Sequence, residues 1–442
     1  MKNTTQLKVR LAVLVFLEFA VWGSYLTSMG AFLAREGLAG QIGWFYAIQG
    51  VVSLFMPALV GIVADRWIPA QKMLCLCHFI AGGFMLAAGV YGLTVSPINF
   101  APLFILYTIS VAFFMPTIGL ANSVSYTALG KYGLDPVTHF PPVRVFGTVG
   151  FICAMLFVNF TGFQNTAMQL VCSGVLSFAM ALYSLTMPKC PINKGVSKSL
   201  SEALGLKAFA LFKDKQMAIF FIFSMLLGVS LQITNGFANP FIQSFGSLPE
   251  YADTWGVNNA NALISLSQMS ETLCILLIPF FLRRFGIKVV MLMAMVAWVF
   301  RFGFFGIGNP GSGVWLFILS MIVYGIAFDF FNVSGSLYVD KKTTTEIRSS
   351  AQGLFMIMTN GIGATIGTLV AQAVIDKYVY SQPEGAAQIE GWSTSWLIFA
   401  GYAAVVAILF FFVFHDKDNK QATNKELEKA DSSLLSDPEG LA

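Results

Sequence analysis

Charged residues are scarce in this sequence. Asp, Glu, Lys and Arg together make up 11% of its 442 residues, whereas 56% of the residues are hydrophobic. A water-soluble chain of this length could not cover so much apolar surface with so little charge. The composition therefore argues against a soluble globular protein and predicts that lipid surrounds most of the chain.

Histidine and cysteine are also scarce, with three and six residues, and they form no metal-binding or catalytic pattern. Cys75 and Cys77 are spaced C-x-C, but no histidine or carboxylate pattern completes a ligand set. We interpret the cysteines as small buried side chains. A nucleophile–base pair is not evident either, so we expect no enzyme activity and no bound metal or cofactor.

Long apolar runs, in contrast, are abundant. A membrane-spanning helix needs about 20 mainly apolar residues, and twelve segments meet this requirement. The runs are continuous rather than alternating, which favours helices over a β-barrel. We therefore predict an all-α integral membrane protein with twelve transmembrane helices. The segments cover 9–33, 41–64, 73–94, 99–128, 143–162, 166–187, 216–246, 258–282, 288–307, 313–338, 349–376 and 392–415.

Basic residues are unevenly distributed between the loops, and this bias predicts the orientation. The loops on one side contain only Arg35 and Lys377, whereas the other side holds many lysines and arginines. We therefore expect both termini in the cytoplasm and a multi-pass protein of the plasma membrane. The basic side contains Lys2, Lys8, Arg10, Arg66, Lys72, Lys131, Arg144, Lys189, Lys194, Lys198, Lys207, Lys213, Lys215, Arg283, Arg284, Lys288, Lys341, Lys342 and Arg348.

A basic central loop, residues 188–215, divides the chain into two sets of six spans, 1–187 and 216–415. Residues 416–442 form a polar tail that we expect to be cytoplasmic and disordered. Weak sequence similarity between the halves suggests a duplication. The fourth span contains Asn122, Ser123, Ser125 and Tyr126, and the tenth span contains the similar set Asn332, Ser334, Ser336 and Tyr338. Paired six-helix halves around a central site are typical of transporters.

The loop after the second span contains Gly61-Ile-Val-Ala-Asp65-Arg66. This stretch resembles the loop signature of the major facilitator superfamily, although the family's later glycine and second basic cluster are replaced by Ile68-Pro-Ala-Gln-Lys72. An ordinary charged turn is the alternative. The resemblance implies that Gly61, Asp65 and Arg66 act in conformational change.

Ionisable residues within the spans are few, and each costs roughly 3 kcal/mol in the bilayer core. Asp329 lies between aromatic residues, where burial disfavours the charged carboxylate, so that it could carry a proton. A structural ion pair with Arg301 of the neighbouring span is the alternative, and the two can coexist. The group consists of Glu18, His78, Arg144, Glu271, Arg301 and Asp329. We assign His78 no role beyond bonding a carbonyl near a helix end.

Several polar side chains repeat at helical spacing. Gln232 and Asn235 lie three residues apart, as do Gln268 and Glu271, so each pair shares a helix face. Four long polar side chains in neighbouring spans predict a polar cavity, whereas hydrogen bonding that only holds the bundle together is the alternative.

Two further faces combine charge with aromatic rings. Arg144, Thr148 and Phe151 share one face of the fifth span, although an arginine at the membrane edge can also extend toward water. Tyr324 and Phe328 could form an aromatic wall near Asp329, although plain packing is the alternative. One face of the first span carries Glu18, Trp22 and Tyr25. Whether Glu18 is a second group that binds a proton or substrate stays open.

Longer stretches resemble the bacterial nucleoside–proton symporters of the major facilitator superfamily, and the similarity runs from the first span to the twelfth. They include Phe140-Pro-Pro-Val-Arg144-Val-Phe-Gly-Thr148-Val-Gly-Phe151, Leu231-Gln-Ile-Thr-Asn235, Ser267-Gln-Met-Ser-Glu271 and Ser320-Met-Ile-Val-Tyr324-Gly-Ile-Ala-Phe328-Asp329. The resemblance implies a nucleoside site between the halves. Its expected lining is Arg144, Thr148, Phe151, Gln232, Asn235, Gln268, Glu271, Tyr324, Phe328 and Asp329.

The resemblance also implies proton coupling through buried carboxylates. Asp329 is the first candidate for the residue that carries the proton, Glu271 is the second, and Glu18 is a further candidate. The family more often has a neutral amide where this chain has Glu18, and a tryptophan where it has Phe146. We therefore expect a proton-coupled symporter that imports nucleosides, purine or pyrimidine, by alternating access with substrate at the midplane.

Other readings stay open at this point. One is a carrier for a sugar or another neutral hydroxylated solute, and another, of a different class, is a membrane receptor that transports nothing. The several amides favour a hydroxyl-rich neutral solute over a drug cation. We expect nucleoside, protons and membrane lipid as partners, no nucleic acid, and a monomer.

Overall fold

The structure of the chain, a computed structural model, describes residues 4–192, 206–344 and 347–415. Helices and short connections account for these residues, and no β-strand occurs among them. The expected tail, residues 416–442, lies outside the described residues.

Helices occupy all six spans expected in the first half. The first span is α1 followed by α2, and the second is α3 followed by α4. The bounds are α1 Thr4–Gly23, α2 Met29–Arg35, η1 Ala39–Gln41, α3 Ile42–Ser53, α4 Met56–Arg66, α5 Ala70–Thr94, α6 Phe100–Lys131, α7 Pro136–Phe160, η2 Phe163–Asn165 and α8 Met168–Ser184.

The second half repeats this pattern with more interruptions. The seventh span is α10 followed by α11, and the eleventh combines α16 and α17 with two π-helical segments, η5 and η6. The bounds are η3 Leu206–Lys213, α10 Lys215–Leu231, α11 Ile233–Ser244, η4 Phe245–Ser247, α12 Trp255–Asn258, α13 Ala260–Phe285, α14 Ile287–Ile307, α15 Val314–Lys342, α16 Arg348–Met356, η5 Ile357–Gly363, α17 Ala364–Ile375, η6 Asp376–Tyr380 and α18 Ala386–Val413.

Within the described residues, nine helices are long and apolar enough to cross a membrane, or ten if α3 and α4, bent by 41°, count as one span. The bend falls just before Pro57, which has no N–H to bond the carbonyl one turn earlier. The two remaining expected spans, which contain α1 and α8, do not meet this criterion, and each has a physical reason. Helix α1 carries Lys8, Arg10 and Glu18 within 20 residues, and α8 is only 17 residues long.

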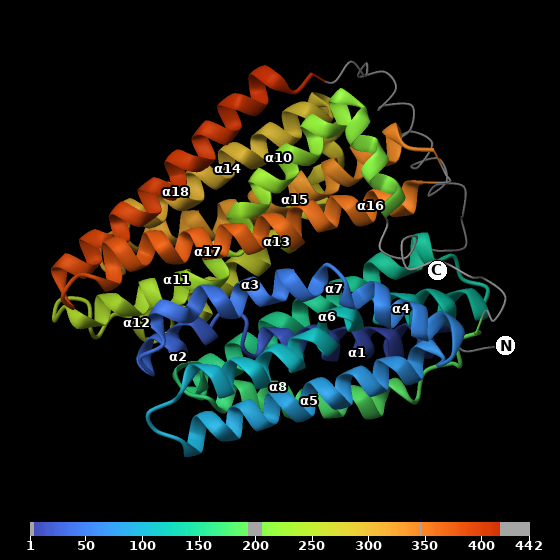
Figure 1. Cartoon of the computed structure of the whole chain (residues 1–442), viewed down its shortest axis with the longest axis horizontal. Coiled ribbons are helices and arrows are strands. Elements are labelled where there is room, and N and C mark those ends of the chain that lie inside the picture. The colour runs from blue at the N-terminus through green and yellow to red at the C-terminus, as the bar shows by residue number, and fades with distance from the viewer. Residues whose placement is uncertain (1–3, 193–205, 345–346, 416–442) are drawn as a thin grey trace.

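The helices group into two bodies that follow the order of the chain (Figure 1). In the first, α1 packs against α7 and α8, and α5 packs against α6 and α8. In the second, α14 packs against α15 and α18, and α13 packs against α15. The bodies touch most extensively where α7 meets α13, where α3 meets α17 and η5, and where α2 meets α11.

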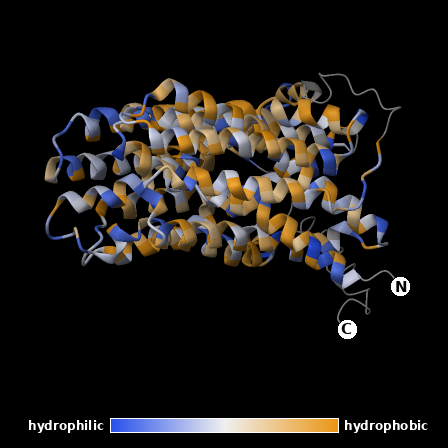
Figure 2. Cartoon of the chain, turned by 90° about the horizontal axis from the view of Figure 1, so that it is seen from below, coloured by the Kyte–Doolittle hydropathy of each residue, from blue (hydrophilic) through white to orange (hydrophobic). Residues whose placement is uncertain are grey.

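Many large apolar side chains point outward, among them Phe79, Phe160, Leu276 and Phe412, each at least 60% exposed. Figure 2 shows the consequence: hydrophobic residues dominate the length of the bundle, and hydrophilic residues gather toward its ends. This surface suits lipid along the sides and water at the ends.

The two ends of the bundle differ. Helix α1 begins and α18 ends at the same end, which we call the proximal end, and the opposite one is the distal end (Figure 1). The halves approach very closely on the distal side of the break between α1 and α2. A Cβ atom on Gly30 would lie 2.1 Å from the carbonyl oxygen of Gly236 in α11, so only glycine fits there.

Candidate substrate site

The expected face of α7 packs in part against α1 of the same half. The Arg144 guanidinium lies over the Phe19 ring of α1, 4.0 Å from its centroid. Gly147 leaves room for this contact, because a Cβ atom there would lie 2.8 Å from both the Arg144 Nη1 atom and the Phe19 ring. One turn further along α7, the Phe151 ring packs edge to face against the Trp22 ring of α1, with the ring centroids 6.2 Å apart.

The aromatic wall expected on α15 is present. The rings of Tyr324 and Phe328 stack with centroids 5.6 Å apart and an interplanar angle of 19°. Asp329 follows directly and is 5% exposed. Its Oδ2 atom has no hydrogen-bond partner among the described residues. A buried acceptor of this kind carries a free-energy cost unless a proton or a ligand satisfies it.

The amide pairs lie on two other helices of the same half. Gln268 of α13 is within hydrogen-bonding reach of the Tyr324 side chain. Gln232 falls at the break between α10 and α11, and the Asn235 Nδ2 atom donates to its Oε1 atom at 2.8 Å. The Gln232 amide N–H groups and the Asn235 side-chain oxygen find no partner in the described part of the chain.

One cation of the first half lies within electrostatic range of two acids of the second. Arg144 of the first half interacts electrostatically with Glu271 and Asp329 of the second. No direct ion pair joins them within the described ranges. The structure thus gathers sequence-predicted residues from α7, α13 and α15 around one electrostatically linked region.

Glu18 lies in a separate cluster inside the first half. Its Oε2 atom is 2.8 Å from the Nε2 atom of His78 in α5, and Thr117 of α6 donates to its Oε1 atom at 2.6 Å. The other ring nitrogen of His78 is 2.9 Å from the Ser177 hydroxyl of α8. Glu18 is 1% and His78 0% exposed. The cluster cross-links four helices.

Two sequence-based expectations were wrong. His78 is the ninth residue of α5 and so lies away from the ends of that helix. Its ring nitrogens bond side chains rather than a carbonyl. Arg301 forms no recorded ion pair with Asp329. Its Nη1 atom donates to the Ser320 carbonyl at 2.9 Å and its guanidinium lies 4.3 Å from the Tyr324 ring centroid. Asp329 is five residues further along α15, more than one turn away.

Sequence reasoning also missed a polar seal at the distal end. The Asn261 Nδ2 atom donates to the Met155 carbonyl at 3.0 Å, and its Oδ1 atom accepts from Thr27 at 2.6 Å. Gln372 links to the backbone of α3 in the same way, through Gly43 and, just before α3, Ala39. The run Asn258-Asn-Ala-Asn261 was a signal, because three amides in four residues at the start of a span need partners.

The structure says little about the loop motif that follows the second span. Gly61 lies in α4 with open space where a Cβ atom would be, and Arg66 is the last residue of that helix. The side chain of Asp65 lies outside the described part of the structure. The role of Gly61, Asp65 and Arg66 therefore stays a prediction.

Two six-helix bodies that meet around polar groups, with an apolar outer surface, define a multi-pass membrane transporter. The model of the nucleoside H⁺ symporter family matches residues 5–419, and the chain belongs to this family. The resemblance to nucleoside–proton symporters is thereby confirmed.

Relatives match over almost their whole length. The xanthosine permease of Escherichia coli (strain K12) is 46% identical over 417 residues, which cover 93% of this chain and 97% of the permease. Nucleoside permease NupG of the same organism is 46% identical over 425 residues, which cover 95% and 99%.

Solved structures confirm the fold class. The crystal structure of nucleoside transporter NupG matches with a TM-score of 0.84 at 46% identity, over 93% of this chain and 100% of that chain. The crystal structure of a D-xylose–proton symporter matches with a TM-score of 0.63 at 14% identity, over 93% and 97%, and supports the fold alone. The chain has the twelve-helix major facilitator fold.

Proposed function

We propose that the chain imports nucleosides together with protons by alternating access, with substrate held between the two halves. The observation that carries this proposal is the juxtaposition of Arg144 in one half with Glu271 and Asp329 in the other. Family membership and the names of the relatives, a xanthosine permease and a nucleoside permease, support nucleosides as the substrate class. We assign the protein no enzyme activity.

The candidate residues suit the chemistry of a nucleoside. The amide side chains of Gln232, Asn235 and Gln268 carry donors and acceptors that can bond ribose hydroxyls and base edges. The stacked rings of Tyr324 and Phe328 offer an aromatic surface to a base, whether purine or pyrimidine. We place Arg144, Thr148 and Phe151 opposite them as the contribution of the first half, and Glu271 and Asp329 among the acceptors.

Asp329 is our first choice for the coupling proton, followed by Glu271. A buried carboxylate without a hydrogen-bond partner at one oxygen is costly when charged, and protonation removes that cost. Neutralising the acid would let the loaded carrier change conformation. Glu18 is the weaker candidate, since both of its oxygens already accept or share hydrogen bonds inside the first half.

The inter-half hydrogen bonds support an inward-facing state. Across the described residues, those between the halves lie toward the distal end, where Asn159, Gln164, Asn261 and Gln372 supply most of them. The bias of basic residues puts the proximal end in the cytoplasm of a bacterial cell. The substrate site would then open inward and be sealed from outside.

We divide the protein into a first half, residues 1–187, a cytoplasmic connection, 188–215, a second half, 216–415, and a cytoplasmic tail. The connection contains η3, which packs against α10 and α16. We expect the protein to work as a monomer in the inner membrane, with no nucleic-acid partner.

Uptake by purified protein in vesicles tests the proposal. Radiolabelled uridine and adenosine should accumulate when an inward proton gradient is imposed, and dissipating the gradient should abolish accumulation. D-xylose provides a matched neutral, hydroxylated control. Saturable xylose uptake without nucleoside uptake would point to a sugar carrier, and nucleoside binding without uptake would point to a receptor.

A further inference from the structure

A shallow groove of about 250 Å³ lies on the outer surface of the first half, between the first turns of α1 and α7. It is separate from the candidate substrate site. Phe146, at its deeper end, follows Arg144 by two residues, which turns it about 200° around α7 and away from the other half. The lining consists of Lys8, Val9, Ala12, His139, Pro142, Val143 and Phe146.

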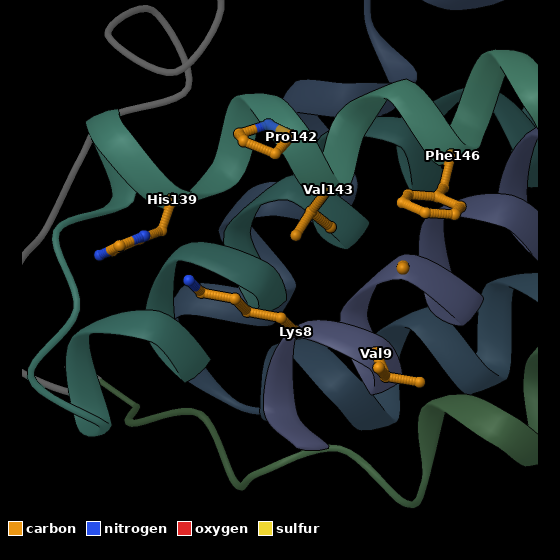
Figure 3. A pocket seen from close by; sticks show the side chains of 7 residues that line it. Lys8, Val9, His139, Pro142, Val143 and Phe146 are labelled. Carbon is orange, nitrogen blue, oxygen red and sulfur yellow. The ribbon is translucent and has the colours of Figure 1, made fainter. Parts of the chain in front are cut away.

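Two nitrogen-bearing side chains lie at the proximal end of this groove. Lys8 is the fifth residue of α1 and His139 the fourth of α7, and both helices begin at that end. Figure 3 shows the nitrogen atoms of both side chains on the same side of the groove. Neither side chain has a hydrogen bond or ion pair with another described residue. Asp135, the nearby acid, bonds the Thr138 backbone and hydroxyl.

The groove becomes apolar with depth. Phe146 lies seven residues beyond His139, about 10 Å further along the helix axis. Val9 and Phe146 are 57% and 48% exposed on the lipid-facing surface, and Figure 3 shows them at the end away from the nitrogen atoms. A lysine ammonium group and a histidine ring at the membrane boundary, with apolar side chains below, match the polarity of a phospholipid, whereas a free anion would leave the apolar part unused.

We propose that this groove binds one anionic phospholipid. Lys8 and His139 hold the headgroup phosphate, and the first part of an acyl chain lies against Val9, Ala12 and Phe146. Charge complementarity distinguishes the occupant from a zwitterionic lipid, because a second positive group on the headgroup would oppose Lys8.

Native mass spectrometry of the full-length protein in detergent, with phosphatidylglycerol titrated in, tests the site. We expect one phosphatidylglycerol to bind more tightly than phosphatidylcholine. Lys8→Ala should weaken that binding about five-fold, in line with the contribution of one basic residue near a lipid surface. Lys72→Ala is the matched control, since Lys72 is an exposed lysine in the first turn of α5, and it should leave binding unchanged.

Two further arms separate a lipid from a free phosphate source. Phe146→Asn, which keeps both nitrogen groups, should also weaken phosphatidylglycerol binding, and glycerol phosphate at the same concentration should not displace the lipid. Equal lipid binding by the wild type and Lys8→Ala would overturn the proposal, and so would full displacement by glycerol phosphate. Retained nucleoside uptake by each variant checks that it is folded.

Discussion

At the scale of single residues, the spacing of side chains along helices carried much of the information about the candidate site. Arg144, Thr148 and Phe151 are predicted on one face of a helix, and Arg144 interacts electrostatically with two acids of the other half. Spacing within one helix says nothing about which helix lies opposite. The pairing of Glu18 with His78 joins residues 60 positions apart and could not be read from the sequence.

Asp329 provides the most direct test of coupling. Asp329→Asn keeps the shape of the side chain but can no longer bind and release a proton. We expect gradient-driven uridine accumulation to disappear, while exchange of labelled for unlabelled uridine across the vesicle membrane persists, since substrate can still bind. Asn332→Ala, which removes a side chain that bonds its own helix at the Phe328 carbonyl, is the control. Undiminished accumulation by Asp329→Asn would move the coupling role to Glu271 or Glu18.

Glu18 can be tested for the same role with two substitutions. Glu18→Gln can still accept from Thr117 and donate to His78, so we expect gradient-driven uptake within about two-fold of the wild type. Glu18→Ala leaves His78 and Thr117 without their partner in a buried site, which costs about 1–3 kcal/mol. A lower unfolding temperature in detergent should reveal this cost. Loss of proton-driven accumulation in Glu18→Gln, with folding intact, would instead make Glu18 a coupling residue.

At the scale of helices, the apolar runs of the sequence predicted the positions of the spans but not their interruptions. The break at Gln232, the bend at residues 54–55 and the π-helical turn of η5 lie inside runs that remain apolar. Hydropathy reports the solvent around a segment, whereas a break depends on local backbone geometry and on contacts with neighbouring helices. Pro57 was the one signal in the sequence that accounts for a bend by itself.

Gly30 shows how one position controls the approach of two helices. Alanine there would place a Cβ atom 2.1 Å from the Gly236 carbonyl oxygen, so α2 and α11 must separate at the distal end. Overpacking of this kind costs about 1–3 kcal/mol. We expect Gly30→Ala to reduce the maximal rate of uridine uptake several-fold. Gly401→Ala is the matched control, because a Cβ atom on Gly401 in α18 meets nothing within 4 Å. Equal losses in both variants would contradict the prediction.

At the scale of the whole molecule, hydrogen bonds between described residues join the two halves toward the distal end. Asn261 is fully buried and bonds Thr27 and Met155 with its side chain, while its backbone N–H donates to Gln164 at 3.3 Å. One residue of the second half thus holds three segments of the first. A carrier that alternates must break these bonds to open at the distal end, so their strength biases the balance between the two states.

Asn261→Ala removes both side-chain bonds and should therefore favour the outward-facing state. At about 0.6 kcal/mol for each such bond within a membrane, the equilibrium should shift roughly eight-fold. Double electron–electron resonance between spin labels at Thr161 and Glu250, exposed positions at the distal ends of the two halves, should show a larger population of long distances. Ser244→Ala is the control, since the Ser244 hydroxyl bonds only its own helix, at Phe241. Identical distance distributions in Asn261→Ala and the wild type would mean that the seal is held by apolar contacts instead.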